Sequence, residues 1–146
     1  MNDLNDAPIG RLLGIAGRMT AARFHRLLEE QGMTHAGWQA LLALDGTGGL
    51  TQREVAERCY VTPATVTGVV DTLERDGLVV RERGTDDRRV VRVRLTDTGR
   101  KRLAATKRAA AKAMGEVFGD LTPRDEAVVR RFLVRTVERL GEEGDQ

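Results

Sequence analysis

The sequence predicts a mainly α-helical protein with a small β-hairpin wing, a winged helix-turn-helix with further helices at both ends. Two capped helices follow one another between residues 51 and 76. Two segments that alternate apolar and charged residues come next, separated by a polar loop. Residues 81–112 carry 12 basic and 4 acidic side chains, a net charge of +8, whereas the whole chain of 146 residues carries +2. Positive charge on a hairpin beside a helix pair indicates phosphate binding.

Two helices are predicted ahead of this region. Apolar residues recur at helical spacing over residues 9–30, and Pro8 suits the first turn of that helix. Thr34 can cap a second helix, which carries Trp38 and ends at Gly46.

The next segment carries the start signals of a helix-turn-helix. Thr51 and Glu54 have the spacing of a capping box, in which each side chain accepts the other residue's backbone N–H. Thr62 followed by Pro63 marks a second start, because a hydroxyl caps the helix and proline leaves no N–H unsatisfied. Tyr60 stands at the turn position where glycine is common. A helical hairpin within a bundle is the alternative interpretation of this segment alone.

The alternating segments Leu78–Arg83 and Val90–Leu95 predict the two strands of a hairpin. Alternate residues of the second segment are expected to face the core: Val91, Val93 and Leu95. Two arginines between them are expected to face outward: Arg92 and Arg94.

Two long helices are predicted after the hairpin, one from Thr96-Asp97 to about Phe118 and one from Thr122-Pro123 onward. The chain is predicted to form a single domain over residues 1–146, with a DNA-binding part at 34–96 and dimerisation helices at 8–31 and 97–141. The apolar faces of the terminal helices are too extensive for one copy to cover. A symmetric homodimer is therefore expected.

Several classes of function are excluded by composition. The single cysteine, Cys59, excludes an internal disulfide, and with two histidines it gives poor material for a metal site. No apolar run approaches a membrane span and no signal peptide is evident, so a cytoplasmic protein is expected. No phosphate loop, catalytic triad or carboxylate pair is recognisable, so neither an enzyme nor a cofactor is expected.

The helix-turn-helix and the hairpin predict two kinds of contact with double-stranded DNA. Short side chains at the start of the second helix allow it to enter a major groove about 12 Å wide. The residues predicted to read bases there are Thr62, Pro63, Ala64, Thr65, Thr67 and Gly68. The residues predicted to act in the wing are Arg81, Arg83, Asp87, Arg88 and Arg89. Thr51 and Gln52, at the N-terminus of the first helix, are predicted to contact phosphate.

Within the wing, Arg88 and Arg89 can reach an adjacent minor groove. Asp87 is expected to form a bidentate carboxylate–guanidinium bond that shapes the loop. Arg81, Arg83, Arg92 and Arg94 are expected to attract phosphate without specifying sequence.

The run from Thr62 to Val79 resembles the recognition helix and following strand of MarR-family transcriptional regulators. Asp87-Arg88-Arg89 and Leu95-Thr96-Asp97-Thr98-Gly99 resemble that family's wing and its connection to the next helix. The resemblance implies a winged-helix homodimer joined by its first and last helices and bound to a palindromic operator. It also implies that Arg89 enters the minor groove with Asp87 as its partner. A ligand-responsive repressor is therefore expected.

Alternatives remain for the function and for four residues. A non-specific architectural DNA-binding protein, or a redox-responsive regulator that uses Cys59, would fit the same charge pattern. Cys59 falls on the apolar side of its helix and is interpreted as a core residue. Trp38 is interpreted as core, with contact to an effector as the alternative, because the family's effector cleft borders this helix. His25 and His35 are assigned to helix surfaces rather than to a metal or ligand.

Overall fold

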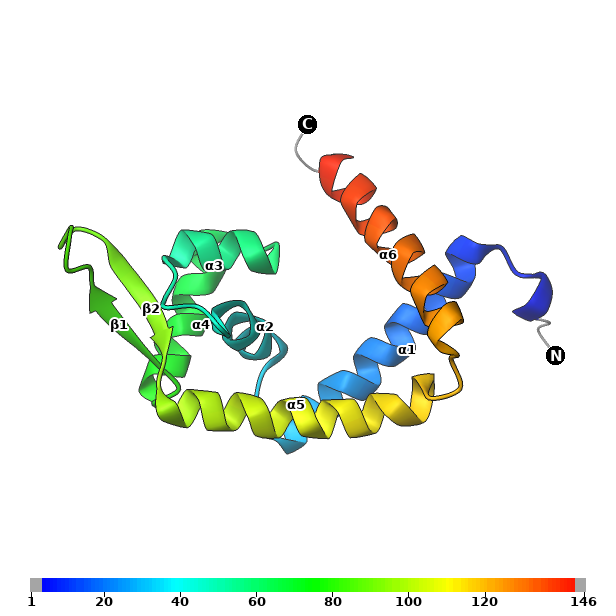
Figure 1. The fold of residues 1–146 in the computed structure, drawn as a ribbon, viewed down its shortest axis with the longest axis horizontal. Coiled ribbons are helices and arrows are strands. Elements are labelled where there is room, and N and C mark those ends of the chain that lie inside the picture. The colour runs from blue at the N-terminus through cyan, green and yellow to red at the C-terminus, as the bar shows by residue number, and fades with distance from the viewer. Residues whose placement is uncertain (1–3, 144–146) are drawn as a thin grey trace. The chain divides into compact units, whose positions relative to one another are not determined.

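A computed structural model describes residues 4–143 of the chain (Figure 1). Its elements, in order, are η1 (Leu4–Asp6), α1 (Ile9–Glu30), α2 (His35–Leu44), α3 (Gln52–Cys59), α4 (Pro63–Arg75), β1 (Val79–Arg83), β2 (Val91–Leu95), α5 (Asp97–Phe118) and α6 (Pro123–Glu143). The predicted fold class, mainly helical with a two-stranded wing between α4 and α5, is confirmed. The chain forms two compact units that divide between Ala110 and Ala111.

The predicted helix caps are present. The Thr34 hydroxyl accepts the N–H of Gly37 at 3.0 Å at the start of α2. Both bonds of the capping box between Thr51 and Glu54 form at the start of α3, at 3.2 and 2.8 Å. Thr62 caps α4, with Pro63 in the first turn. The local signals for these helices therefore agree with the tertiary fold.

Tyr60 ends α3 in the left-handed conformation, with φ 56° and ψ 41°. Within residues 4–143 it is the only residue other than glycine with positive φ. The sharp turn between α3 and α4 requires this backbone conformation, which explains why glycine is common at the position.

The core of the first unit lies among α2, α3, α4 and the hairpin, with contributions from the end of α1 and the first half of α5. Its fully enclosed side chains are mostly aliphatic, as a sequence with 3% aromatic residues requires. Central members are Leu28, Leu41, Leu44, Val55, Val70, Val79, Val93 and Leu103. Leu50 adds a one-residue bridge to Val93, with both backbone hydrogen bonds formed, so the hairpin is anchored to the segment ahead of α3.

β1 and β2 pair antiparallel, with Val79 opposite Leu95 and Arg83 opposite Val91. Val93 and Leu95 face the core as predicted. The prediction was wrong for Val91, which is 38% exposed. Alternation gave the correct face, but Val91 lies opposite Arg83 at the far end of the ribbon, two residues beyond the bridge to Leu50.

The junction between the wing and α5 is closely packed. The Thr96 hydroxyl donates to the carbonyl of Gly77 at 2.6 Å and accepts the N–H of Gly99 at 3.0 Å. The Thr96 N–H donates to the carbonyl of Leu78 at 3.1 Å. A Cβ at position 99 would lie 1.9 Å from that carbonyl oxygen. Only glycine fits there, because the first turn of α5 lies directly against the backbone of Leu78.

The terminal helices expose apolar side chains in the single chain. On α1 these are Ile9, Leu13 and Met19. On α6 they are Val128, Val129, Phe132, Leu133, Val134, Val137 and Leu140. The predicted single domain over 1–146 and dimerisation helices at 8–31 and 97–141 stay predictions, and the first and last three residues lie outside the described residues. Within the described range, no helix is long and apolar enough to cross a bilayer.

Candidate nucleic-acid interface

The N-terminal half of α4 presents a face of small, exposed residues. Val66, Val70 and Leu73 turn inward and are buried. All six residues predicted to read bases are exposed: Thr62, Pro63, Ala64, Thr65, Thr67 and Gly68. A Cβ added at Gly68 would meet no atom within 4 Å. Among the described residues, this face of α4 is therefore open to solvent at the positions predicted to read bases.

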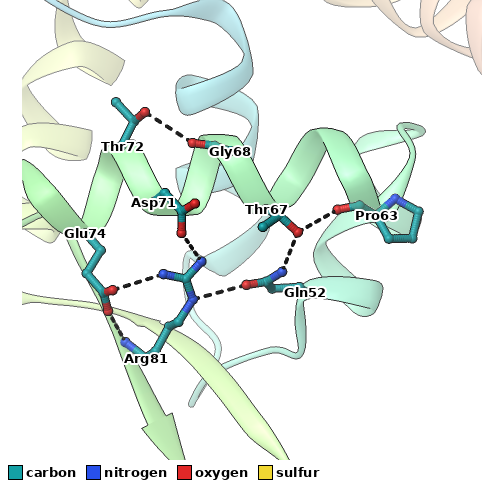
Figure 2. Close-up of polar contacts among 8 residues, drawn as sticks. All are labelled: Gln52, Pro63, Thr67, Gly68, Asp71, Thr72, Glu74 and Arg81. Atoms are coloured by element: carbon teal, nitrogen blue, oxygen red, sulfur yellow. Dashed lines mark hydrogen bonds and ion pairs between the residues drawn. The ribbon is translucent and has the colours of Figure 1, made fainter.

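The threonine hydroxyls on this face already have partners within the protein. Thr62 Oγ1 lies 2.9 Å from Thr65 Oγ1 and accepts the Thr65 N–H at 3.3 Å. Thr67 Oγ1 donates to the carbonyl of Pro63 at 3.2 Å and accepts Gln52 Nε2 at 3.0 Å (Figure 2). These bonds fix the hydroxyl directions before any ligand arrives, which sequence reasoning did not anticipate.

The N-terminus of α3 holds a carboxylate of its own. Glu54 Oε2 accepts the N–H of Thr51 at 2.8 Å. This backbone bond lowers the pKa of Glu54 from its usual 4.5, against partial desolvation of the carboxylate. The predicted phosphate contact at Thr51 and Gln52 would therefore compete with a negative charge already at this helix end.

At the tip of the wing, Asp87 and Arg89 are in contact. Asp87 Oδ1 accepts the Arg89 backbone N–H at 3.0 Å and the Arg89 Nε at 3.3 Å. The prediction of a bidentate pair was wrong in its geometry, because a single oxygen, Asp87 Oδ1, accepts both bonds. The two residues are two apart in a tight turn, which brings the Arg89 backbone N–H and side chain to the same oxygen. The Arg89 side chain remains 92% exposed. Within residues 4–143 the Arg83 and Arg88 side chains have no bonded partner.

The other hairpin arginines are engaged with acids. Arg92 lies 3.4 Å from Glu54, and Arg94 pairs with Glu82 across the ribbon. The hydrogen bond and charge of Arg94 lower the pKa of Glu82. The expected phosphate attraction is therefore partly cancelled at these two positions, and at Arg89 by Asp87, whereas Arg83 and Arg88 have no acidic partner among residues 4–143.

Arg81 is held most closely of all (Figure 2). Its guanidinium contacts Asp71 at 2.6 Å, Glu74 at 3.0 Å and Gln52 Oε1 at 3.1 Å, and the side chain is 24% exposed. A signal for this cluster was present in the sequence. Asp71 and Glu74 stand three apart, on one face of the helix that leads into the strand bearing Arg81.

Trp38, interpreted as a core residue with contact to an effector as the alternative, lies in the core. It is 6% exposed and packs edge-to-face on Phe24, with ring centroids 5.8 Å apart. A cavity of about 340 Å³ does lie among α2, α3 and α4, and His35 and Cys59 contribute to its lining. Trp38 is not among the lining residues.

The remaining predicted sensing residues occupy ordinary positions. His25 is exposed and lies 3.2 Å from Glu29, one turn along α1. Cys59 is half-buried and packs against the core, as interpreted from the sequence. Desolvation raises the pKa of its thiol, which reduces the thiolate needed for redox chemistry. Within residues 4–143, no group of three potential metal-ligating side chains is close enough to hold an ion.

A capped helix-turn-helix, a basic wing and flanking helices define the winged helix-turn-helix class. The MarR family's sequence profile matches residues 31–90. The transcriptional repressor Mb2911 of Mycobacterium bovis is 31% identical over 140 residues, which cover 94% of this chain and 96% of that protein. The chain belongs to the MarR family of transcriptional regulators. It is thus assigned to a family of regulators rather than of enzymes.

Other relatives are similar over shorter segments. The repressor MdtR of Bacillus subtilis is 43% identical over 72 residues, 49% of this chain. The matches to MdtR and to two further B. subtilis regulators span 46, 64 and 54% of those proteins' lengths.

CouR of Rhodococcus jostii RHA1 is similar in structure. The CouR complex with p-coumaroyl-CoA matches with a TM-score of 0.79 and 28% identity, over 94% of each chain. CouR bound to a 23-mer DNA duplex matches with a TM-score of 0.77 and 29% identity, over 94% of this chain and 96% of that one.

Proposed function

We propose that this protein is a sequence-specific repressor that binds a palindromic operator as a homodimer and responds to a small-molecule effector. The observation that carries the proposal is that two surfaces occur in one unit. One is the exposed face of small residues on α4, and the other is a wing tip where Arg89 is paired with Asp87 but 92% exposed and Arg88 is exposed. The small face suits a major groove, and the wing tip suits the adjacent minor groove.

In this proposal the residues divide by task. Pro63, Ala64 and Gly68 allow α4 to approach base edges closely. Arg89, oriented by Asp87, enters the minor groove, and Arg83 and Arg88 attract phosphate. CouR bound to a DNA duplex resembles the chain over nearly its full length, which supports DNA binding by this fold.

A palindromic operator follows from a dimer. α1 and α6 each expose apolar side chains, and each favours burial against a second copy, since an exposed apolar patch usually marks an interface. A twofold axis would set two copies of α4 about 34 Å apart, one turn of the duplex. The palindrome in the DNA would then mirror the symmetry of the protein.

A small-molecule effector is proposed from a structural relative and from a cavity beside α4. CouR was crystallised with p-coumaroyl-CoA, an aromatic acyl thioester. The cavity beside α4 is lined mainly by apolar groups and borders Thr65 and Val66 of the helix proposed to read DNA. A ligand there, or at a dimer interface, would shift the position of α4. A cytoplasmic location stays a prediction.

The wing provides the first test. Arg89→Ala should weaken binding to the operator by about 1–3 kcal/mol, measured by fluorescence anisotropy at constant salt. Asp87→Ala should produce part of the same loss, because it releases Arg89 from its oriented position. Lys101→Ala, which removes an exposed charge from α5, is the control for net charge.

Unchanged affinity in Arg89→Ala would remove the wing from the mechanism. Equal binding of the wild-type protein to operator and random DNA would instead support the architectural alternative.

A further inference from the structure

One chain of hydrogen bonds joins three elements of the DNA-facing unit (Figure 2). It begins at Arg81 on β1, passes through Gln52 at the start of α3 and ends at Thr67 on α4. Arg81 is fixed at its other end by Asp71 and Glu74 of α4, and Glu74 also accepts the Arg81 backbone N–H at 2.8 Å. The base of the wing, the first helix and the recognition helix are therefore bonded to one another.

The chain has only one chemically consistent direction. A guanidinium is a donor at every nitrogen, so the Gln52 carbonyl oxygen must face Arg81 Nε, at 3.1 Å. The Gln52 amide nitrogen then faces Thr67 Oγ1, at 3.0 Å, and donates to it. Thr67 must accept that bond, and its own proton goes to the carbonyl of Pro63, at 3.2 Å.

This order leaves the Thr67 hydroxyl with one unused lone pair and no unused proton. A hydroxyl has one proton and two lone pairs, and here the proton and one lone pair are engaged. Thr67 is an exposed residue, and this lone pair is the hydrogen-bonding capacity of its hydroxyl that no protein group within residues 4–143 uses. A partner can use it only by donating a hydrogen bond.

In the major groove only two bases present such a donor: adenine through its N6 amino group and cytosine through its N4 amino group. Guanine and thymine present oxygen acceptors at the equivalent edge, and Thr67 has no proton left to give them. We propose that Arg81 is a positioning residue which, through Gln52, makes Thr67 an acceptor-only reader of an amino-bearing base, adenine or cytosine, at one position of each operator half-site. This inference rests on the DNA-binding function proposed above.

Arg81 thus differs in role from the other wing arginines. Its three guanidinium nitrogens all face protein acceptors, so it gives little attraction to phosphate and instead offsets the charges of Asp71 and Glu74 beside the groove. Arg83, two residues along the same strand and free of such contacts among the described residues, is the matched control.

The test measures base preference in the wild-type protein and in variants. A preferred half-site is first selected from random duplexes, and each position is then changed in turn. The wild type should prefer adenine or cytosine over guanine or thymine by about five- to tenfold at one position, the lower end of the usual cost of a mismatch. Thr67→Val should abolish that preference, and Thr67→Ser should keep it.

The hydrogen-bond chain from Arg81 through Gln52 to Thr67 is tested by two variants that leave Thr67 in place. Gln52→Met removes the donor that fills one lone pair of Thr67, so the hydroxyl is no longer fixed and its proton can leave the Pro63 carbonyl and turn toward the DNA. The preference should then fall to within about twofold, and because glutamine carries no charge the salt slope should stay the same. Arg81→Met should lose the same preference and also weaken binding to all duplexes, because two carboxylates are released. Arg83→Met should keep the preference and reduce the salt slope by about 1.

Two results would overturn the inference: wild-type base preference in both Gln52→Met and Arg81→Met, or a preference that survives Thr67→Val. Thermal unfolding of each variant distinguishes loss of the fold from loss of the base preference. If Arg81→Met fails to fold, Gln52→Met still provides the test, because it retains both ion pairs of Arg81. A wild-type protein that selects no sequence overturns the proposed function itself. A selective wild type without any position sensitive to Thr67 overturns only this inference.

Discussion

The arginines of the hairpin have the same chemistry but different surroundings, and the surroundings divide their roles. Arg81 is enclosed by two carboxylates and an amide. Arg89 lies on the surface, held by one carboxylate oxygen. A count of basic residues treats both as positive charge available to DNA. The ion pairs that form in the folded unit reduce the number of arginines available to phosphate, so the wing tip provides most of the attraction to DNA.

Tyr60 illustrates a local conflict at a single position. A non-glycine residue in the left-handed region costs roughly 1–2 kcal/mol. The side chain is 83% exposed, so burial returns little of this cost. Tyr60→Gly is therefore expected to raise the free energy of unfolding by about 1 kcal/mol, measured by urea denaturation. A loss of stability of similar size would show that Tyr60 makes contacts that outweigh the strain.

At the scale of elements, the start of α3 should give a pH-dependent contribution. The pKa of Glu54 is lowered from 4.5 in the folded state, so its carboxylate stabilises the fold at pH values above 4.5. That contribution disappears as the pH falls through the folded-state pKa. Glu54→Gln should therefore be less stable than the wild type at pH 7 and nearly as stable at the lowest pH where both fold.

Urea denaturation at a series of pH values tests this expectation. A stability difference that stays constant down to low pH would contradict it, because the neutral glutamine and the protonated glutamate are nearly isosteric.

The junction between the wing and α5 should tolerate almost no change. Gly99→Ala places a methyl group 1.9 Å from the Leu78 carbonyl oxygen, so the helix start or the strand start must move. We expect a loss of about 3 kcal/mol or more, above the usual range for an overpacked site, measured by thermal unfolding. Gly68→Ala, in an open helical position, should instead gain up to about 1 kcal/mol. Similar stabilities for the two variants would contradict the close approach.

The sequence was sufficient for the elements whose signals are local. The caps at Thr34, Thr51 and Thr62 depend on residues three positions apart, and all three formed as predicted. Exposure of Val91 could not be predicted, because strand alternation gives the face of a ribbon but not how far the core extends along it. The spacing of Asp71 and Glu74 indicates an acidic face on α4, but which arginine contacts that face depends on how α3, α4 and β1 pack.

For Trp38 the interpretation from the sequence, a core residue, agrees with its burial against Phe24. The alternative, contact with an effector, was implied only by resemblance to a family. The family assignment was accessible from the recognition helix and the wing-to-helix connection. The direction of the hydrogen bonds on α4 needed three-dimensional positions.

At the scale of the whole molecule, α6 should make the protein a dimer. Between Val128 and Leu140 its exposed large apolar residues are each 38–63% exposed. Three of them, Val129, Leu133 and Val134, line a groove of about 550 Å³ together with Met114 and Phe118. Leu133→Asp places a charge in this surface. We expect it to convert a dimer to a monomer in sedimentation experiments and to lose operator binding. Glu138→Lys, which changes a charge outside the apolar set, should remain dimeric.

A wild-type protein that sediments as a monomer at micromolar concentration would count against this part of the account. A monomeric Leu133→Asp variant with full operator affinity would separate dimerisation from DNA binding.

The central claim is that one copy of the helix-turn-helix and wing reads each half of a palindrome. The most direct measurement is the affinity of the wild-type protein for a palindrome from its own promoter and for a shuffled duplex of the same composition, over a series of salt concentrations. We predict two chains per palindrome, an affinity at least about a thousandfold above that for shuffled DNA, and a steep loss of affinity with salt. Equal affinity for both duplexes, or one chain bound per palindrome, would contradict the account.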